Sequence, residues 1–303
     1  MTTEKILIHT LVDIDSVDMV HNEIRVLNKL CFPGSEIPLF ERCFEDTLRL
    51  FNGEFKGYQP CKTKYHDLRH TLEAVLATAR LIHACVISGR TISLHGFELA
   101  IIATLMHDIG YILEEEESGT GGQHTLVHVE RSANFMERYG STLGISDRDI
   151  ESCCCMITST SMSIPLESIH FDSEETKLLA KIVGSADLLG QMADRLYLEK
   201  LLCLFLEFEE AGISGISHEF DFLCQTKSFY TLVMRRLENP LDSLHLMMSL
   251  HFRERWRIDR DLYREAIDMN MEYLEILLNK HKDDYRSKLK RGGIVERLTK
   301  QVS

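Results

Sequence analysis

The chain has 303 residues, of which 44% are hydrophobic and 27% charged, a composition typical of one large globular domain or two small ones. Nucleic-acid binding relies on clustered Lys and Arg, so the formal net charge of −13 argues against a nucleic-acid partner. The first residues show no export signal, and no apolar run reaches the roughly 20 residues that span a bilayer. We therefore expect a cytoplasmic protein without a membrane anchor.

Helical periodicity dominates the chain, because apolar residues repeatedly step by three and four positions. In chain order it predicts helices over 37–52, 68–82, 99–113, 127–140, 147–160, 179–189, 196–211, 219–238, 241–252 and 259–290. Strand signals are nearly absent, and no low-complexity linker divides the sequence. The predicted fold class is therefore all-α, a single-domain helical bundle, with its longest loops over 114–123 and 160–173.

Ionisable residues interrupt two of the most apolar segments. His107 and Asp108 lie within "LAIIATLMHDIGYIL", and Asp187 lies within "LLAKIVGSADLLGQM". An unpaired carboxylate in such surroundings costs several kcal/mol, so each needs a partner, which is either a distant Arg or a divalent metal. Imidazole with carboxylate is the ligand set of Zn, Mn and Fe and, with more oxygen, of Mg. The sequence thus predicts one or two divalent metal ions. Neighbouring His and Asp side chains diverge on a helix, but a distortion at Gly110 would let both reach one ion.

The stretch "YHDLRHTLEAV" places His66 and His70 four residues apart at the start of a predicted helix, and hence on one face. Taken alone, the two imidazoles are either a surface pair or part of a shared polar pocket. With the doublet at 107–108 and Asp187, His70 becomes a candidate metal ligand from a third helix, since helical bundles build metal sites from facing helices.

In this order, "YHDLRH", "LMHDIG" and "SADLLG" resemble the HD superfamily of metal-dependent phosphohydrolases, over about residues 60–195. The first motif is similar to the H-N-x-x-H element of cyclic nucleotide phosphodiesterases. The resemblance implies that His66 is a general acid and that Asp108 bridges two metals where two are present. It implies metal-ligand roles for His70, His107, Asp108 and Asp187.

The sequence departs from both branches of the superfamily that it resembles. Asp67 stands where the phosphodiesterase motif has Asn, and no second His follows the doublet. "HDIGY" resembles the H-D-I-G motif of bacterial cyclic dinucleotide phosphodiesterases, but Tyr111 replaces their Lys. The substrate class of neither branch can therefore be carried over.

A second pair of histidines four residues apart, His124 and His128, lies in "QHTLVHVERSANF". In two-metal members of the superfamily this part of the chain carries a ligand of the second metal, and the resemblance is better at His128. Both are candidate metal ligands. The alternative is that both flank a loop and face the solvent.

The resemblance implies an HD/PDEase-type fold. We expect 1–35 to be an N-terminal extension, 36–215 the metal-binding catalytic core, and 216–303 a set of C-terminal helices packed on it. We expect a hydrolase acting on a phosphoester or phosphodiester, with a small phosphorylated substrate such as a nucleotide. The partner is a small molecule rather than nucleic acid or membrane, and a homodimer is compatible with the sequence. Two alternatives stay open: a catalytically silent nucleotide-binding signalling module, and a di-iron oxygenase on the same scaffold.

Overall fold

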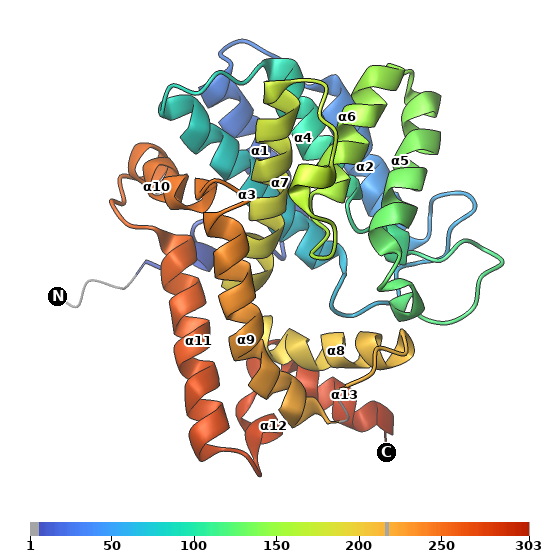
Figure 1. Cartoon of the computed structure of the whole chain (residues 1–303), viewed down its shortest axis with the longest axis vertical. Helices are drawn as coiled ribbons and strands as arrows, with labels where there is room; N and C mark the ends of the chain where they lie inside the picture. Colours follow the sequence, from blue (N-terminus) through green and yellow to red (C-terminus); the bar gives the residue numbers. More distant parts are fainter. Residues whose placement is uncertain (1–5, 216–217, 303) are drawn as a thin grey trace.

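The computed structural model describes residues 6–215 and 218–302, and within them the fold is all-α and forms a single domain (Figure 1). The helices of these residues are α1 (Val17–Cys31), α2 (Pro38–Asn52), α3 (Leu68–Ile87), α4 (Leu94–Met106), α5 (His128–Leu143), α6 (Asp147–Thr158), α7 (Glu174–Ala193), α8 (Tyr197–Glu210), α9 (Glu219–Glu238), α10 (Met248–Trp256), α11 (Leu262–Lys280), α12 (Tyr285–Lys288) and α13 (Ile294–Val302). Short 3-10 helices join several of them. The predicted fold class is confirmed.

Helices α3, α4 and α7 form the centre of the molecule. Most residues of α3 and α7 are buried, and so is every residue of α4 from Gly96 onward except Glu98. Among the described residues, α3 alone is long and apolar enough to cross a membrane, but 83% of its most apolar window is buried inside the molecule. Such burial is what the core helix of a globular protein shows.

The remaining helices cover this centre (Figure 1). Helix α1 packs against α3, while α2, α5 and α6 pack around α4. From the C-terminal part, α10 contacts α3 and α11 contacts α7. Helices α8, α9, α11, α12 and α13 make up the lower part of the view in Figure 1, with α9 and α11 in contact.

The structure corrects three of the predicted helices and adds two others. Helix α4 ends at Met106 instead of continuing to residue 113, because the chain turns at the His107–Asp108 doublet into the 3-10 helix η2 (Ile109–Tyr111). The segment predicted as a helix over 241–252 is a turn followed by η5 (Leu244–Met247) and α10. The long helix predicted over 259–290 stops at residue 280, and α1 and α13 had not been predicted at all.

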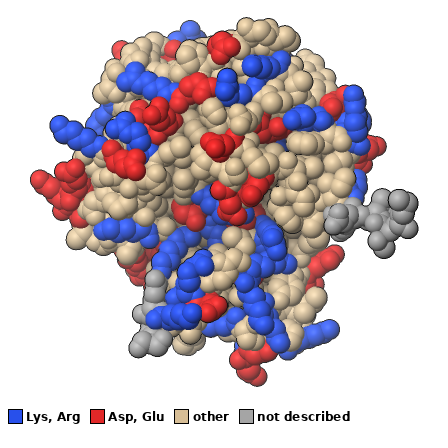
Figure 2. Space-filling model, turned by 180° about the vertical axis from the view of Figure 1, so that it is seen from behind, with Lys and Arg blue, Asp and Glu red and all other residues tan. Residues whose placement is uncertain are grey.

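The negative net charge is unevenly distributed over the surface. Figure 2 shows Lys and Arg gathered over the lower part of the face opposite to that of Figure 1. This part of the fold contains the C-terminal segment, which is rich in Lys and Arg from residue 280 onward. An acidic protein therefore presents a locally cationic region.

Candidate metal centre

The first histidine motif lies at the start of α3. The Asp67 side chain caps this helix by accepting a hydrogen bond from the His70 backbone N–H at 2.9 Å, and it also pairs with Lys200 Nζ at 2.9 Å. Asp67 thus contacts the backbone of His70 and the side chain of Lys200. His66 precedes the helix cap, so the two histidines do not share a helical face as predicted. Their rings are nevertheless adjacent, with centroids 5.8 Å apart.

The helix is distorted at the His107–Asp108 doublet, as is needed for both side chains to reach one ion. Because α4 ends at Met106, His107 and Asp108 occupy the transition into η2, and both side chains face the same buried space. The Nδ1 of His107 is 2.7 Å from the carbonyl oxygen of Thr104. A hydrogen bond donated from Nδ1 leaves the lone pair of His107 Nε2 directed at the site, as in many metal-bound histidines.

Asp187 reaches this space from α7, which packs closely against α3. Gly190 makes the approach possible, since a Cβ there would lie 3.0 Å from the backbone nitrogen of Ala74. The close contact between the helices brings Asp187 Oδ1 to 3.2 Å from His70 Nε2. Three helical segments therefore converge on one point.

Three ligand-type atoms, on His70, His107 and Asp187, lie close to one another around that point, and Asp108 Oδ2 lies against both imidazoles. His70 Nε2 lies 3.2 Å from Asp108 Oδ2, and His107 Nε2 lies 3.1 Å from the same oxygen. His107 Nε2 is 3.5 Å from Asp187 Oδ1 and 3.4 Å from His70 Nε2. Two ligands of one Zn²⁺ ion, each bonded at 2.0–2.1 Å, lie about 3.3 Å apart in tetrahedral coordination. The observed spacing therefore fits a single first-row metal ion.

The directions of these contacts support the same interpretation. Asp108 Oδ2 is fully buried and has no hydrogen-bond partner among the described residues, although two imidazole nitrogens lie close to it. Contacts of hydrogen-bond length that lack hydrogen-bond geometry are expected when neighbouring lone pairs point at a common centre rather than at each other. We name His70, His107, Asp108 and Asp187 the metal cluster.

The electrostatics of the metal cluster favour a positive charge at its centre. Burial alone would lower the pKa of both histidines. Contacts with Asp108 and Asp187 outweigh burial and raise the pKa of His70 and, more strongly, that of His107. Burial would also raise the pKa of both carboxyl groups, but the neighbouring imidazoles hold each pKa below its ordinary value. The carboxylates thus stay ionised, and the positive charge they favour is supplied either by protons on the imidazoles or by a metal ion.

His128 extends the cluster on the other oxygen of Asp108. Its Nε2 lies 3.7 Å from Asp108 Oδ1, and its Nδ1 lies 2.7 Å from the carbonyl oxygen of Thr125. Burial lowers the pKa of His128 despite the neighbouring carboxylate, which favours the neutral imidazole that metals bind. A Cβ at Gly110 would lie only 2.0 Å from the His128 carbonyl oxygen, so this glycine permits the close approach of α5. Asp108 and His128 could therefore hold a second ion.

His66 is half-buried beside the cluster and belongs to a different group of contacts. Its Nδ1 lies 2.6 Å from Glu207 Oε2 on α8, and its ring stacks on Tyr111 with a centroid distance of 4.1 Å. The other oxygen of Glu207 accepts hydrogen bonds from the backbone N–H groups of Lys64 and Tyr65, at 3.0 and 2.8 Å. The carboxylate thereby fixes both the backbone and the ring of this segment.

Glu207 and Tyr111 had not been predicted as site residues. A signal for Glu207 existed, because it is an acidic residue in the apolar stretch "LLCLFLEFEE". This is the same kind of signal that identified Asp187. Its pairing with His66, 141 positions earlier in the chain, depends on the tertiary structure.

The structure does not bring His124 to the metal cluster. Its Nε2 faces Glu117 Oε1 at 3.3 Å, and Glu117 in turn makes two hydrogen bonds with Arg131, at 3.0 and 2.8 Å. His124 lies in the 3-10 helix η3 (Gly122–His124), before α5 begins at His128, so helical spacing does not place the two on one face. Of the two histidines predicted here, only His128 contacts the cluster.

Comparison with known proteins assigns a family. A family model described as Npun_R2479-like matches residues 113–267, about half of the chain, and the protein belongs to this family. The matched region contains His128, Asp187 and Glu207, whereas His66, His70 and the doublet precede it. No curated protein and no solved structure matched the chain. The resemblance to the HD superfamily therefore stays a prediction that rests on the three motifs.

Proposed function

We propose that this protein is a metal-dependent phosphohydrolase that cleaves a phosphoester or phosphodiester bond in a small substrate, with a nucleotide as the first candidate. The observation that carries the proposal is the convergence of two imidazoles and two carboxylates on one buried point, with spacings of 3.1–3.5 Å that fit one metal ion. The order of the motifs, which resembles that of HD phosphohydrolases, supports the same chemistry.

The donor set fits a divalent metal ion of the Zn, Mn, Fe or Mg group. His70, His107, Asp108 and Asp187 would hold one ion, and His128 with the second oxygen of Asp108 would contribute to another. A bound divalent ion lowers the pKa of water toward neutrality and neutralises charge on phosphoryl oxygens. Asp108 would have two roles, because its Oδ2 faces the imidazoles of His70 and His107 while its Oδ1 faces that of His128.

His66 would act as the proton donor to the departing oxygen. Glu207 holds the imidazole by its Nδ1 at 2.6 Å, which leaves Nε2 available to carry and release a proton. The ring is held in orientation by stacking on Tyr111, and its side chain keeps 13% exposure, enough to meet a bound substrate. His66 pairs with Glu207 through Nδ1 and is not one of the four residues of the metal cluster, so we assign it a role in proton transfer and no role as a ligand.

Metal analysis of the purified full-length protein, combined with turnover of a generic phosphodiester and a nucleotide panel, tests the proposal. We expect about one to two divalent ions per chain and phosphate-ester hydrolysis that a chelator abolishes. In Asp108→Ala both metal content and hydrolysis should fall, while Asp283→Ala, which alters an exposed carboxylate, serves as the matched control.

Each of the other outcomes contradicts the proposal in a recognisable way. Retained metal and retained hydrolysis in Asp108→Ala would remove the cluster from the reaction. A bound iron pair with redox activity and no hydrolysis would indicate an oxygenase. Tight nucleotide binding without turnover or metal would indicate a silent binding module.

A further inference from the structure

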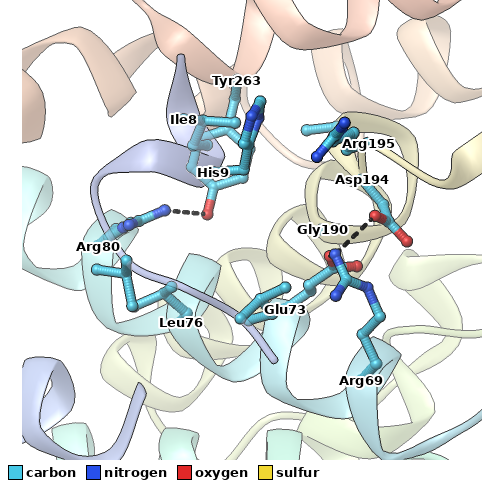
Figure 3. A pocket seen from close by; sticks show the side chains of 13 residues that line it. Ile8, His9, Arg69, Glu73, Leu76, Arg80, Gly190, Asp194, Arg195 and Tyr263 are labelled. Atoms are coloured by element: carbon cyan, nitrogen blue, oxygen red, sulfur yellow. Dashed lines mark hydrogen bonds and ion pairs between the residues drawn. The ribbon is translucent and has the colours of Figure 1, made fainter. Parts of the chain in front are cut away.

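A small cavity lies beneath the N-terminal segment. On α3 it is lined mostly by residues that follow His70 in the sequence. Figure 3 shows Ile8 and His9 above it, Arg69, Glu73 and Leu76 below it, and Arg80 and Arg195 on opposite sides. The cavity has a volume of about 40 Å³. Its charged lining consists of His9, Arg69, Glu73, Arg80, Asp194 and Arg195. None of the four residues of the metal cluster lines it.

Arg80 is a buried cation with unused hydrogen-bond donors. Its side chain is 2% exposed, and Nη1 donates a hydrogen bond to Tyr263 Oη at 3.2 Å, while the guanidinium lies over the ring of Phe252. Its Nε and Nη2 are buried and have no partner among the described residues, and none of those residues forms an ion pair with it. Buried charges are normally paired, because an unpaired buried ion or donor is costly. A ligand that accepts hydrogen bonds would satisfy this side chain.

The surroundings of Arg80 are also cationic. Arg195 is exposed at the edge of the cavity and forms no ion pair with a described residue. Burial, and then the nearby charges of Arg195, Arg291 and Arg69, lower the pKa of His9, which shows that the positive potential extends to the cavity wall. Arg69 is offset by Asp194 at 3.1 Å, whereas Arg80 and Arg195 have no such counterion.

Glu73 lies at this wall beside Arg69, whose Nη2 is 3.3 Å from Glu73 Oε1. Burial raises the pKa of Glu73 well above its ordinary value, an effect that the neighbouring Asp194 reinforces and that Arg69 opposes. The raised pKa favours the protonated form of this carboxyl group, which can donate a hydrogen bond at the cavity wall. Its Oε2 is buried and has no partner among the described residues.

We propose that this cavity is a binding site for a small oxyanion, either inorganic phosphate or the carboxylate of a small acid, held between Arg80 and Arg195. A buried water needs at least about 10–15 Å³, so a space of about 40 Å³ suits one phosphate or carboxylate group and excludes a whole nucleotide. Guanidinium groups are the side chains best matched to such oxyanions. The site is separate from the metal cluster, and its existence does not depend on the proposed function.

The test is calorimetric titration of the full-length protein with phosphate and, separately, with acetate, in a phosphate-free buffer. Each titration is run with the metal-loaded protein and again after chelation, because phosphate could also bind a metal ion. Arg195→Gln removes an exposed cation that does not support folding, and Arg257→Gln, at an arginine with 84% side-chain exposure elsewhere on the surface, is the matched control. Arg80→Met removes the buried cation itself.

We expect binding of at least one of the two anions before and after chelation, about tenfold or more weaker in Arg195→Gln and unchanged in Arg257→Gln. In Arg80→Met binding should be lost, and should this variant fail to fold, Arg195→Gln alone decides the test. Tighter binding of phosphate would identify a tetrahedral oxyanion, and tighter binding of acetate a carboxylate. No binding of either anion, binding that chelation abolishes, or equal affinity in Arg195→Gln and the parent protein would overturn the proposal.

Discussion

His66 Nδ1 lies 2.6 Å from Glu207 Oε2, and this contact joins the segment before α3 to α8, a helix in the lower part of the fold. A carboxylate that binds one nitrogen of an imidazole sets the tautomer and the ring orientation, and thereby which nitrogen can transfer a proton. The proposed proton donor therefore depends on a residue outside the motif that contains it.

Replacing Glu207 with Gln should lower turnover about 10–100-fold, the usual cost of removing a group that orients a functional imidazole. Metal content should stay at the level of the parent protein, since Glu207 contacts none of the metal cluster. Steady-state kinetics combined with metal analysis measures both. His66→Gln and the double variant His66→Gln/Glu207→Gln should be about equally slow, because the two residues act as one unit. Additive losses would contradict the pairing.

Asp187→Asn should remove metal binding and destabilise the chelated protein as well. In the chelated form the substitution leaves two buried imidazoles with one carboxylate fewer, and breaking a buried ion pair costs about 3–5 kcal/mol. Urea unfolding in the presence of chelator measures this free energy, and elemental analysis measures the metal. An unchanged free energy of unfolding would show that the carboxylate is not paired as described.

Gly110→Ala should displace the start of α5, because the new methyl group would overlap the His128 carbonyl oxygen, 2.0 Å from the ideal Cβ position. We expect a loss of stability of about 1–3 kcal/mol and a loss of His128 from the site. If the parent protein binds two ions, the variant should bind one. Ser132→Ala is the matched control. It removes only the 2.9 Å hydrogen bond from the Gly110 N–H and should cost about 1 kcal/mol without changing the metal count.

The buried pair His83 and His251 should make the protein sensitive to mild acid independently of any metal. Their Nδ1 atoms are 3.2 Å apart. Burial lowers the pKa of His83 to about 4 and that of His251 well below its ordinary value. In the unfolded chain both bind protons below their ordinary pKa of 6.5. The stabilisation is therefore fully present above pH 6.5 and is lost as the pH falls toward about 4.

Thermal unfolding between those pH values, with chelator present, measures this effect. His83→Gln removes one proton-binding group and should flatten the decline of stability in this range. His170→Gln, at an exposed histidine, should leave the pH dependence unchanged. A decline of the same steepness in His83→Gln and the parent protein would show that other groups cause it.

Much of the fold could be predicted from periodicity alone, because the core helices carry apolar residues at helical spacing. The overextended helix over 99–113 shows the limit of this signal. Apolar residues continue at helical spacing through Ile109 and Leu113, but the chain turns at the doublet, where the side chains of His107 and Asp108 face one site. Helix α1 was missed although Ser16 caps it and Val20, Ile24 and Leu27 mark its buried face.

Within the site, the sequence identified the residues whose charge conflicts with apolar surroundings, namely the doublet and Asp187. Helical spacing could not separate His128 from His124, although the resemblance to the HD superfamily was better at His128. In the structure, the start of α5 and the position of Glu117 distinguish them. Glu207 required knowledge of which distant segment lies beside His66. Local pattern thus predicts which residues need a partner, and the tertiary structure determines which partner each obtains.

Helix α3 carries three buried ionisable side chains in turn along its length: His70 in the metal cluster, Arg80 at the oxyanion cavity, and His83 in the histidine pair. With a rise of about 1.5 Å per residue, His70 and Arg80 are about 15 Å apart along one continuous rod. A shift or rotation of α3 at one of these two residues therefore also moves the other. An anion that draws Arg80 toward Arg195 would therefore also displace the helix that holds His70. Occupancy of either site would then affect ligand binding at the other.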